Sequence, residues 1–190
     1  MIETEYDVIV AGYGPVGETC ANLLGYYGIK ALILDKEKEA YPLPRAITWD
    51  AECQRAMAHC DFSTKVKTRK IRGVDNQDAN KKSILKITMD GFDTYNYQHS
   101  LLFIHQPQFD EAHRENAKKY KTNTIKTGNE ILSITQSDGT VGCTYKDINT
   151  GQEFKTNSKY LLACDGANST VRKLKNIELK SLDADETWMV

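Results

Sequence analysis

The spacing of apolar residues changes twice within the first 35 positions. Residues 6–11 (YDVIVA) form a short β-branched run, which predicts a buried parallel strand. Residues 15–27 predict a helix and residues 30–35 (KALILD) a second strand, with Gly28 ending the helix between them. The apolar residues at helical spacing are Val16, Cys20, Leu23, Leu24 and Tyr27. We therefore expect a β-α-β unit whose strands are parallel.

The rest of the chain predicts short strands and helices. Prolines extend residues 41–48, and helices are expected over 49–60 and 107–120. Strands are expected at 65–74 and 83–89, followed by a small antiparallel meander. The meander has four expected strands. The first combines residues 123–126 with 130–136, and the others are 140–146, 152–156 and 159–164. Residues 160–174 predict a strand, a polar turn and a helix start, and residues 186–190 the beginning of another strand.

Composition excludes several classes of function. The chain has 190 residues, enough for one domain, and its 25 basic and 26 acidic residues give a net charge of -1. A nucleic-acid or membrane partner is therefore not expected, and the basic residues of 65–74 are read as a solvated strand face. An acidic N-terminus and five scattered cysteines without a C-x-x-C pair predict a cytoplasmic protein with reduced thiols and no structural metal.

Three glycines follow the first predicted strand at G-x-G-x-x-G spacing. Gly12 permits a tight turn, Gly14 lets a diphosphate approach the backbone, and Gly17 lets helix and strand pack closely. The helix N-terminus supplies free N–H groups and partial positive charge. Asp35 ends the second strand, where an acid accepts hydrogen bonds from an adenosine ribose. This pattern predicts FAD or NAD rather than NADP, and by itself leaves the first two open.

Four stretches together resemble the FAD-dependent aromatic hydroxylases, the class A flavoprotein monooxygenases, and within them the 3-(3-hydroxyphenyl)propionate hydroxylase branch. The stretches are GYGPVGETCANLLGYYG, PRAITWDAE (44–52), HQPQFDE (105–111) and YLLACDGANSTVRKL (160–174). The resemblance implies an α/β, Rossmann-like FAD-binding fold with a parallel sheet and a small antiparallel meander. It also implies that residues 1–190 are the N-terminal portion of an FAD-binding domain, truncated before the substrate-covering sheet is complete. Residues 186–190 would begin a strand of the substrate domain.

The resemblance also assigns cofactor contacts. The FAD diphosphate would be lined by Gly12, Gly14, Pro15 and Gly17. Asp35 would bind the adenosine ribose, and the next residue, Lys36, is also expected to contact the cofactor. Arg45 would reach the diphosphate region and Gln106 the ribityl or phosphate side. The main chain at Ile131 would hold adenine, and Asp165 of the D-G pair would handle FAD and NAD(P)H. The plainer alternatives are a surface loop for Arg45, a helix cap for Gln106, core packing for Ile131 and a structural turn for Asp165.

The activity implied by the resemblance is hydroxylation of a phenolic aromatic substrate by O₂, with NAD(P)H as co-substrate, through a C4a-hydroperoxyflavin. No catalytic residue is assigned, because the flavin carries the chemistry and the resemblance implies that the substrate-covering sheet would lie beyond residue 190. Four histidines show no triad or metal spacing, and each is expected at the surface or at a helix cap: His59, His99, His105 and His113. The alternatives are a catalytically inactive nucleotide-binding fragment and an NAD-dependent dehydrogenase.

Overall fold

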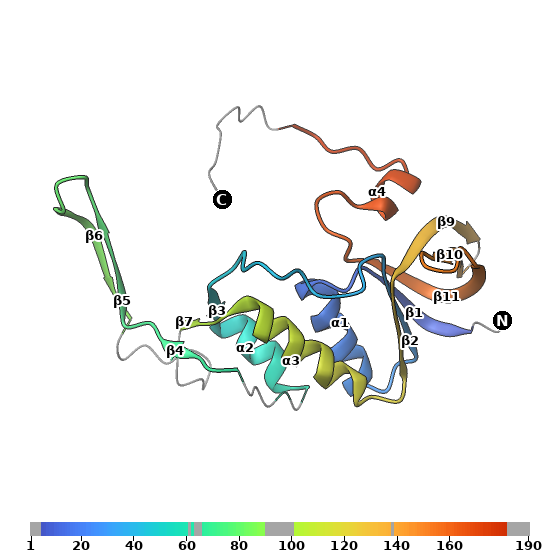
Figure 1. Ribbon diagram of the computed structural model, residues 1–190, viewed down its shortest axis with the longest axis horizontal. Coiled ribbons are helices and arrows are strands. Elements are labelled where there is room, and N and C mark those ends of the chain that lie inside the picture. Colours follow the sequence, from blue (N-terminus) through green and yellow to red (C-terminus); the bar gives the residue numbers. More distant parts are fainter. Residues whose placement is uncertain (1–4, 61, 63–65, 90–100, 138, 182–190) are drawn as a thin grey trace.

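The computed structural model describes residues 5–60, 62, 66–89, 101–137 and 139–181 (Figure 1). The strand expected at 186–190 and His99 lie outside these residues. No helix within the described ranges combines the length and apolar character needed to cross a membrane.

A six-stranded sheet forms the centre of the molecule, with strand order β8-β2-β1-β11-β10-β9. Its strands are β1 (Tyr6–Ala11), β2 (Ala31–Asp35), β8 (Asn123–Thr127), β9 (Asn129–Ser137), β10 (Thr140–Asp147) and β11 (Glu153–Ala163). The helices are α1 (Pro15–Tyr26), α2 (Ala51–Ala58), α3 (Gln106–Lys118) and α4 (Thr170–Leu174). The expected β-α-β unit is confirmed, because β1 pairs in parallel with β2 and α1 connects them.

The strand β8 differs from the prediction in its neighbours. Residues 123–126 were expected to join the antiparallel meander, but β8 pairs in parallel with β2, with Ile33 opposite Ile125. It therefore lies at the opposite edge of the sheet from β9 and β10. Local alternation of apolar residues predicts a strand but not its partner, and β8 follows α3 as the second strand of another parallel crossover.

The strand β11 also differs from the prediction, since one strand of 11 residues replaces the two expected at 152–156 and 159–164. Its first half pairs antiparallel with β10, and its second half pairs in parallel with β1. Ser158 lies at the change, opposite Val141 on one side and Tyr6 on the other. Ser158 is fully buried, and its hydroxyl donates to the Tyr160 carbonyl at 2.8 Å. One strand thus joins the meander to the parallel strands.

The parallel strands separate two apolar layers, as strand alternation requires. On one face, Ile9, Leu32 and Leu34 pack against residues of β9, β10 and α4. On the other face, Val10 and Ile33 pack in a cluster that includes residues of α1 and α3. The meander, the parallel strands and the helix pair therefore form three layers (Figure 1).

The buried face of α1 coincides only in part with the apolar residues at helical spacing, since Cys20 and Leu24 pack partly buried against the core. Val16 and Tyr27 are 64% and 65% exposed. The buried residues of the helix are small or polar: Gly17, Glu18, Ala21, Asn22 and Gly25. A Cβ atom added to Gly25 would lie 2.5 Å from the Tyr120 ring, so close helix packing selects small residues here.

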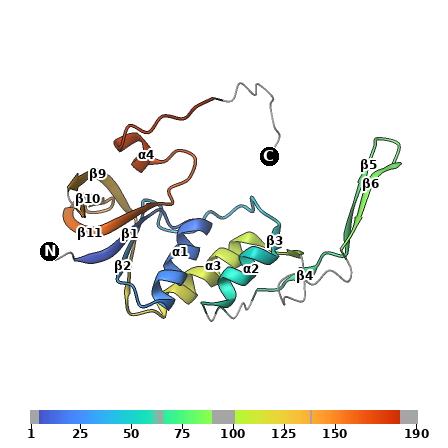
Figure 2. The same cartoon turned by 180° about the vertical axis from the view of Figure 1, so that it is seen from behind.

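Two smaller sheets lie apart from the central one. The first has the order β3-β7-β4 and consists of β3 (Thr48–Asp50), β7 (Leu101–Phe103) and β4 (Arg69–Lys70). The second is the hairpin of β5 (Gly73–Gln77) and β6 (Ser83–Thr88), which projects from the rest of the molecule in both views (Figures 1 and 2). The single strand expected at 65–74 is thus divided between two sheets. The helix expected at 49–60 begins at Ala51, because Asp50 caps it by accepting from the Cys53 N–H at 2.7 Å.

Candidate dinucleotide site

The glycine loop between β1 and α1 is shaped by contact with β11. Gly12 has a φ of +95°, and a Cβ atom there would lie 2.5 Å from the Cys164 carbonyl oxygen. A Cβ atom on Gly17 would lie 2.0 Å from the Gly12 carbonyl oxygen. Gly14 has an ordinary φ of -85°, and a Cβ atom there would meet no atom within 4 Å. Packing therefore requires Gly12 and Gly17, whereas Gly14 leaves free space beside the helix N-terminus.

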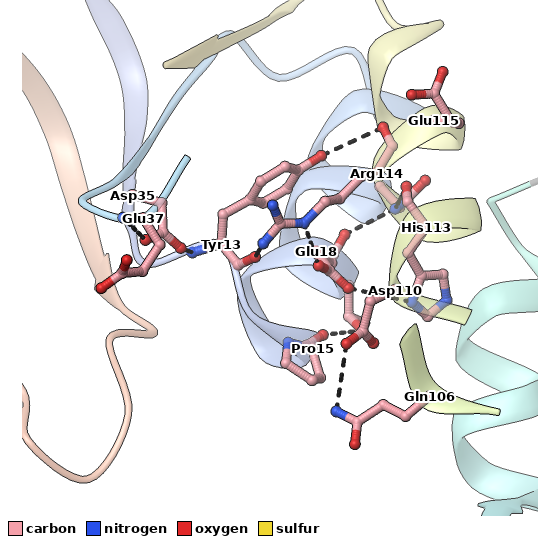
Figure 3. Close-up of polar contacts among 12 residues, drawn as sticks. Tyr13, Pro15, Glu18, Asp35, Glu37, Gln106, Asp110, His113, Arg114 and Glu115 are labelled. Carbon is pink, nitrogen blue, oxygen red and sulfur yellow. Dashed lines mark hydrogen bonds and ion pairs between the residues drawn. The ribbon is translucent and has the colours of Figure 1, made fainter. Parts of the chain in front are cut away.

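The peptide groups on either side of Tyr13 are held by side chains from two other elements. The Tyr13 N–H donates to Asp35 Oδ2 at 2.6 Å, while Asp35 Oδ1 accepts from the Glu37 N–H at 2.8 Å. On the other side, an Arg114 Nη donates to the Tyr13 carbonyl oxygen (Figure 3). Strand β2 and helix α3 thus fix the orientation of the loop's main chain.

Arg114 is held in place by a buried carboxylate on α1. Its Nε donates to Glu18 Oε1 at 2.7 Å, and the Glu18 side chain is completely buried. The Arg114 guanidinium also lies 4.7 Å from the centroid of the Tyr13 ring. His113 Nδ1 lies 3.8 Å from the second carboxylate oxygen of Glu18. A buried ion pair therefore joins α1 to α3 directly behind the glycine loop (Figure 3).

A second buried carboxyl group, that of Asp110, lies beside this pair. The pKa of Asp110 is raised to about 7, mainly by burial and to a smaller extent by the negative charge of Glu18. Gln106 Nε2 lies 3.4 Å from Asp110 Oδ2, and Asp110 Oδ1 has no hydrogen-bond partner among the described residues. The ordinary pKa of an aspartate is 3.8, so in the folded protein Asp110 keeps its proton up to a higher pH than an ordinary aspartate does.

A cavity of about 370 Å³ opens between the loop, α3 and the segment that precedes β3. Gly14, Pro15, Glu18, Tyr41, Arg45, Ala46, Gln106, Asp110 and Arg114 line it. Gln106 Oε1 accepts from the N–H groups of Arg45 and Ala46, each at 2.7 Å, so α3 holds the preceding segment over the cavity. The Arg45 guanidinium lies 3.9 Å from the centroid of the Tyr41 ring.

Four of the residues assigned by resemblance therefore line one cavity, namely Gly14, Pro15, Arg45 and Gln106. Lys36, Ile131 and Asp165 do not line it. Lys36 is exposed directly after β2, and Ile131 is 8% exposed within the core beneath β2 and α4.

Asp165 shapes the turn between β11 and α4. Its Oδ1 accepts from the Ser169 hydroxyl at 2.6 Å, and its Oδ2 accepts from the Val171 N–H at 3.0 Å. Ser169 in turn caps α4 by accepting from the Arg172 N–H at 3.0 Å. Gly166 has a φ of +76° within this turn. The structure thus contains the structural turn that was the plainer alternative for Asp165, and Ser169 caps the helix that follows it.

Sequence reasoning missed the buried polar residues of the site: Glu18, Asp110, His113 and Arg114. His113 was expected at the surface, but it is 2% exposed and its ring packs 4.3 Å from that of Phe109, centroid to centroid. His59 and His105 do lie at helix ends, as expected. Glu18, His113 and Arg114 become recognisable only when α1 and α3 are placed side by side. No group of three potential metal ligands occurs among the residues described.

The glycine loop, the acidic end of β2 and the adjoining cavity define a dinucleotide-binding protein of the β-α-β class. Within this class, the chain matches the family model described as FAD binding domain over residues 5–190 and belongs to that family.

The curated relatives are aromatic hydroxylases. The chain is 30% identical to the 3-(3-hydroxy-phenyl)propionate/3-hydroxycinnamic acid hydroxylase of Comamonas testosteroni, over 99% of this chain and 32% of that protein. It is 27% identical to a probable NADH-specific resorcinol 4-hydroxylase of Rhodococcus jostii, over 97% of this chain and 35% of the relative. The chain thus spans about a third of the length of these relatives. The resemblance seen in the sequence is confirmed.

Solved structures agree on the fold. The p-nitrophenol 4-monooxygenase of Pseudomonas putida superposes with a TM-score of 0.74 at 24% identity, covering 90% of this chain and 43% of that one. The flavin-dependent monooxygenase PieE, solved with FAD and substrate, gives a TM-score of 0.69 at 20% identity, over 92% of this chain and 32% of that one. The expected α/β fold class is confirmed.

Proposed function

We propose that the chain is the FAD-binding part of a flavin-dependent monooxygenase that hydroxylates a phenolic aromatic compound with O₂ and NAD(P)H. The observation that carries the proposal is the family match over residues 5–190, together with a glycine loop that opens at Gly14 onto a cavity. Both curated relatives described above are named as hydroxylases of hydroxylated aromatic compounds, which supports this substrate class. The name of the Rhodococcus relative favours NADH as the reductant.

The residues around the cavity fit a diphosphate. The N-terminus of α1 offers N–H groups and partial positive charge, and Gly14 leaves the space that a phosphate needs. Arg45 and Arg114 line the same cavity, and since Glu18 balances the charge of Arg114, Arg45 supplies the uncompensated positive charge. In our proposal the diphosphate of FAD lies against Gly12, Gly14, Pro15 and Gly17. Arg45 reaches the diphosphate region, and Gln106 contacts the ribityl or phosphate side.

The remaining cofactor contacts follow from the same placement. Each carboxylate oxygen of Asp35 accepts one main-chain N–H and retains a lone pair for an adenosine ribose hydroxyl, with Lys36 at the adjacent exposed position. The main chain at Ile131 would contact adenine, since the Ile131 side chain belongs to the core. Asp165 would act through the shape of its turn, because its carboxylate accepts from Ser169 and Val171 within that turn.

Bound FAD would supply the redox chemistry that activates O₂ for transfer to the aromatic ring. The chain's own residues bind and orient the cofactor: the loop holds the diphosphate, Asp35 holds the ribose, and the Glu18–Arg114 pair keeps the loop in position. None of them is assigned a proton transfer or a covalent step. We further propose that residues 1–190 act within one FAD-binding domain in the cytoplasm, without a nucleic-acid or membrane partner.

The direct test is titration of the purified chain with FAD, followed by flavin fluorescence and equilibrium dialysis, with NADH as the competing dinucleotide. FAD is expected to bind and NADH alone not to bind. The variant Gly14→Ala places a methyl group in the space beside the helix N-terminus without straining the main chain, so it should weaken FAD binding at least about tenfold. Val16→Ala, at the neighbouring exposed position, is the matched control and should bind as the wild type does.

A second candidate function is that of an FAD-binding fragment without hydroxylase activity. The coverage of about a third of each relative's length favours it for the chain on its own. NADH oxidation measured with resorcinol and with 3-(3-hydroxyphenyl)propionate separates the two candidates. Oxidation that rises with either phenol supports the hydroxylase, and FAD binding without any such rise supports the fragment. Binding of NADH but not of FAD would contradict both and favour a dehydrogenase.

A further inference from the structure

Two cysteine thiols meet behind the glycine loop. Cys20 lies on α1 and Cys164 directly follows β11, and their Sγ atoms are 4.0 Å apart although the residues are 144 positions apart in the sequence. Both side chains are partly exposed, and all five cysteines of the chain are free thiols. A disulfide bond is about 2.05 Å long, so side-chain rotations that bring the sulfur atoms about 2 Å closer would join them.

The glycine loop brings these two thiols together. The Cys164 N–H donates to the Ala11 carbonyl at 2.7 Å, so the end of β11 remains paired beside the loop. A Cβ atom on Gly17 would lie 3.6 Å from Cys164 Cβ, and Gly17 precedes Cys20 by three residues on the same side of α1. Since Gly12 and Gly17 carry no side chain, the strand end approaches the helix closely enough for thiol contact.

The two thiols are chemically unequal. The hydrogen bond with Cys164 lowers the pKa of Cys20 to about 7, against the opposing effect of burial. The same contact raises the pKa of Cys164, as does its burial. Cys20 is therefore the better nucleophile at neutral pH, and Cys164 is the thiol placed to react with it after oxidation.

We propose that Cys20 and Cys164 form a reversible disulfide that cross-links α1 to β11 when the protein meets a peroxide. The Cys20 thiolate attacks one oxygen of hydrogen peroxide, the O–O bond breaks, and a sulfenic acid forms as hydroxide leaves and takes up a proton. The Cys164 sulfur then attacks the Cys20 sulfur, the S–O bond breaks, and the Cys164 proton leaves with the hydroxyl group as water. Two thiols and one peroxide thus give one disulfide and two waters.

The other cysteines lack this arrangement. Cys53 is exposed on α2, and the partial desolvation of its thiol, followed by the nearby carboxylate of Asp50, raises its pKa. Cys60 and Cys143 are buried, with pKa values that burial raises. Exposure alone would predict oxidation at Cys53, whereas contact between two thiols predicts it at Cys20 and Cys164. The inference is independent of FAD binding, because the thiols are measured without the cofactor.

The test treats the reduced 190-residue chain with hydrogen peroxide, alkylates the remaining thiols under denaturing conditions and counts them. The wild type should fall from five free thiols to three, and peptide mapping should find Cys20 joined to Cys164 within one chain. Dithiothreitol should restore all five. The exposed-site control Cys53→Ser should likewise lose two thiols, whereas Cys20→Ser and Cys164→Ser should form no intramolecular disulfide.

Two results would overturn the inference. One is a wild-type chain that loses no thiol pair under peroxide, or that cross-links only between chains through Cys53. The other is a Cys20→Ser or Cys164→Ser variant that still loses two thiols within one chain. The wild-type peptide map decides the question even where a serine variant folds poorly, since it locates the bond directly.

Discussion

Glu18 and Arg114 form an ion pair, with 2.7 Å between Glu18 Oε1 and Arg114 Nε, although Glu18 lies in the first turn of α1 and Arg114 lies on α3. The Glu18 side chain has no solvent exposure, while that of Arg114 is 13% exposed. Arg114 also donates to the Tyr13 carbonyl, so the pair connects a buried charge to the main chain of the glycine loop. Helix packing and loop geometry therefore depend on the same two side chains.

Removing one partner should destabilise the fold far more than removing both. Arg114→Ala leaves the Glu18 carboxylate buried without its cation, which should lower the free energy of unfolding by about 3–5 kcal/mol. The double variant Glu18→Leu/Arg114→Leu removes both charges and should recover most of that loss. Urea denaturation followed by circular dichroism measures both effects.

The matched control for this cycle is Arg55→Ala. Arg55 pairs with Glu52 at 2.8 Å on the exposed surface of α2, and such pairs contribute less than about 1 kcal/mol. An Arg114→Ala variant no less stable than Arg55→Ala would contradict the role given to the buried pair.

Asp110 should make the fold less stable as the pH rises from about 4 to about 7. The pKa of Asp110 is raised from 3.8 to about 7, so in this range the folded protein retains a proton that the unfolded chain has lost. The Asp110 contribution to the slope reaches at most about 1.4 kcal/mol per pH unit and vanishes above the folded pKa. Unfolding free energies of wild type and Asp110→Asn, measured from pH 4 to 8, should therefore diverge, with the variant gaining relative stability as the pH rises.

Glu111→Gln serves as the control for this pH dependence, because Glu111 is exposed on the same helix. It should keep the wild-type pH profile. An Asp110→Asn profile parallel to that of the wild type would mean that Asp110 is ionised throughout the range.

Alanine at Gly17 should destabilise the fold, whereas alanine at Gly14 should leave its stability nearly unchanged. In Gly17→Ala the new methyl group would lie 2.0 Å from the Gly12 carbonyl oxygen, so the loop or helix must shift at a cost of about 1–3 kcal/mol. Gly14→Ala meets no atom within 4 Å and should change the free energy of unfolding by less than about 0.5 kcal/mol. Thermal and urea unfolding of the two variants make the comparison. Equal stabilities would show that helix and loop do not pack as closely as described.

Gln106 should hold the segment around Arg45 and Ala46 in place over the cavity. Gln106→Leu removes the acceptor of the Arg45 and Ala46 N–H groups, each bonded at 2.7 Å, so exchange of these amide hydrogens should accelerate about five- to tenfold. Gln106→Glu keeps an acceptor oxygen at this position and should preserve the protection of both amides. Hydrogen exchange followed by NMR resolves the two sites. Slow exchange of both amides in Gln106→Leu would mean that other contacts hold the segment.

Local patterns predicted much of the fold correctly. The β-branched run of β1, the glycines after it and the apolar run of β2 are each contained in a few consecutive residues, and the structure has the β-α-β unit that they predict. The D-G turn was equally readable, since Asp165 and Ser169 bond within their own turn and helix cap. Family resemblance identified Gln106 and Arg45, which the structure brings together at one cavity.

The errors arose where a residue's environment is made by a distant segment. Glu18 and Asn22 lie on the buried face of α1 because α3 supplies Arg114 and the His113 carbonyl, and no periodicity along α1 could reveal those partners. His113 was expected at the surface for the same reason. Likewise, β8 looks like a meander strand until its pairing with β2 is seen.

The sequence by itself determined the elements around the glycine loop and the family, because backbone preferences and short motifs act between neighbouring residues. Only the tertiary structure decided which polar side chains are buried together, because ion pairing and desolvation depend on contacts such as Glu18 with Arg114, 96 positions apart. The same holds for the thiol pair of Cys20 and Cys164. Their contact exists because two glycines let a strand end approach a helix, and close approach is a property of the packed fold.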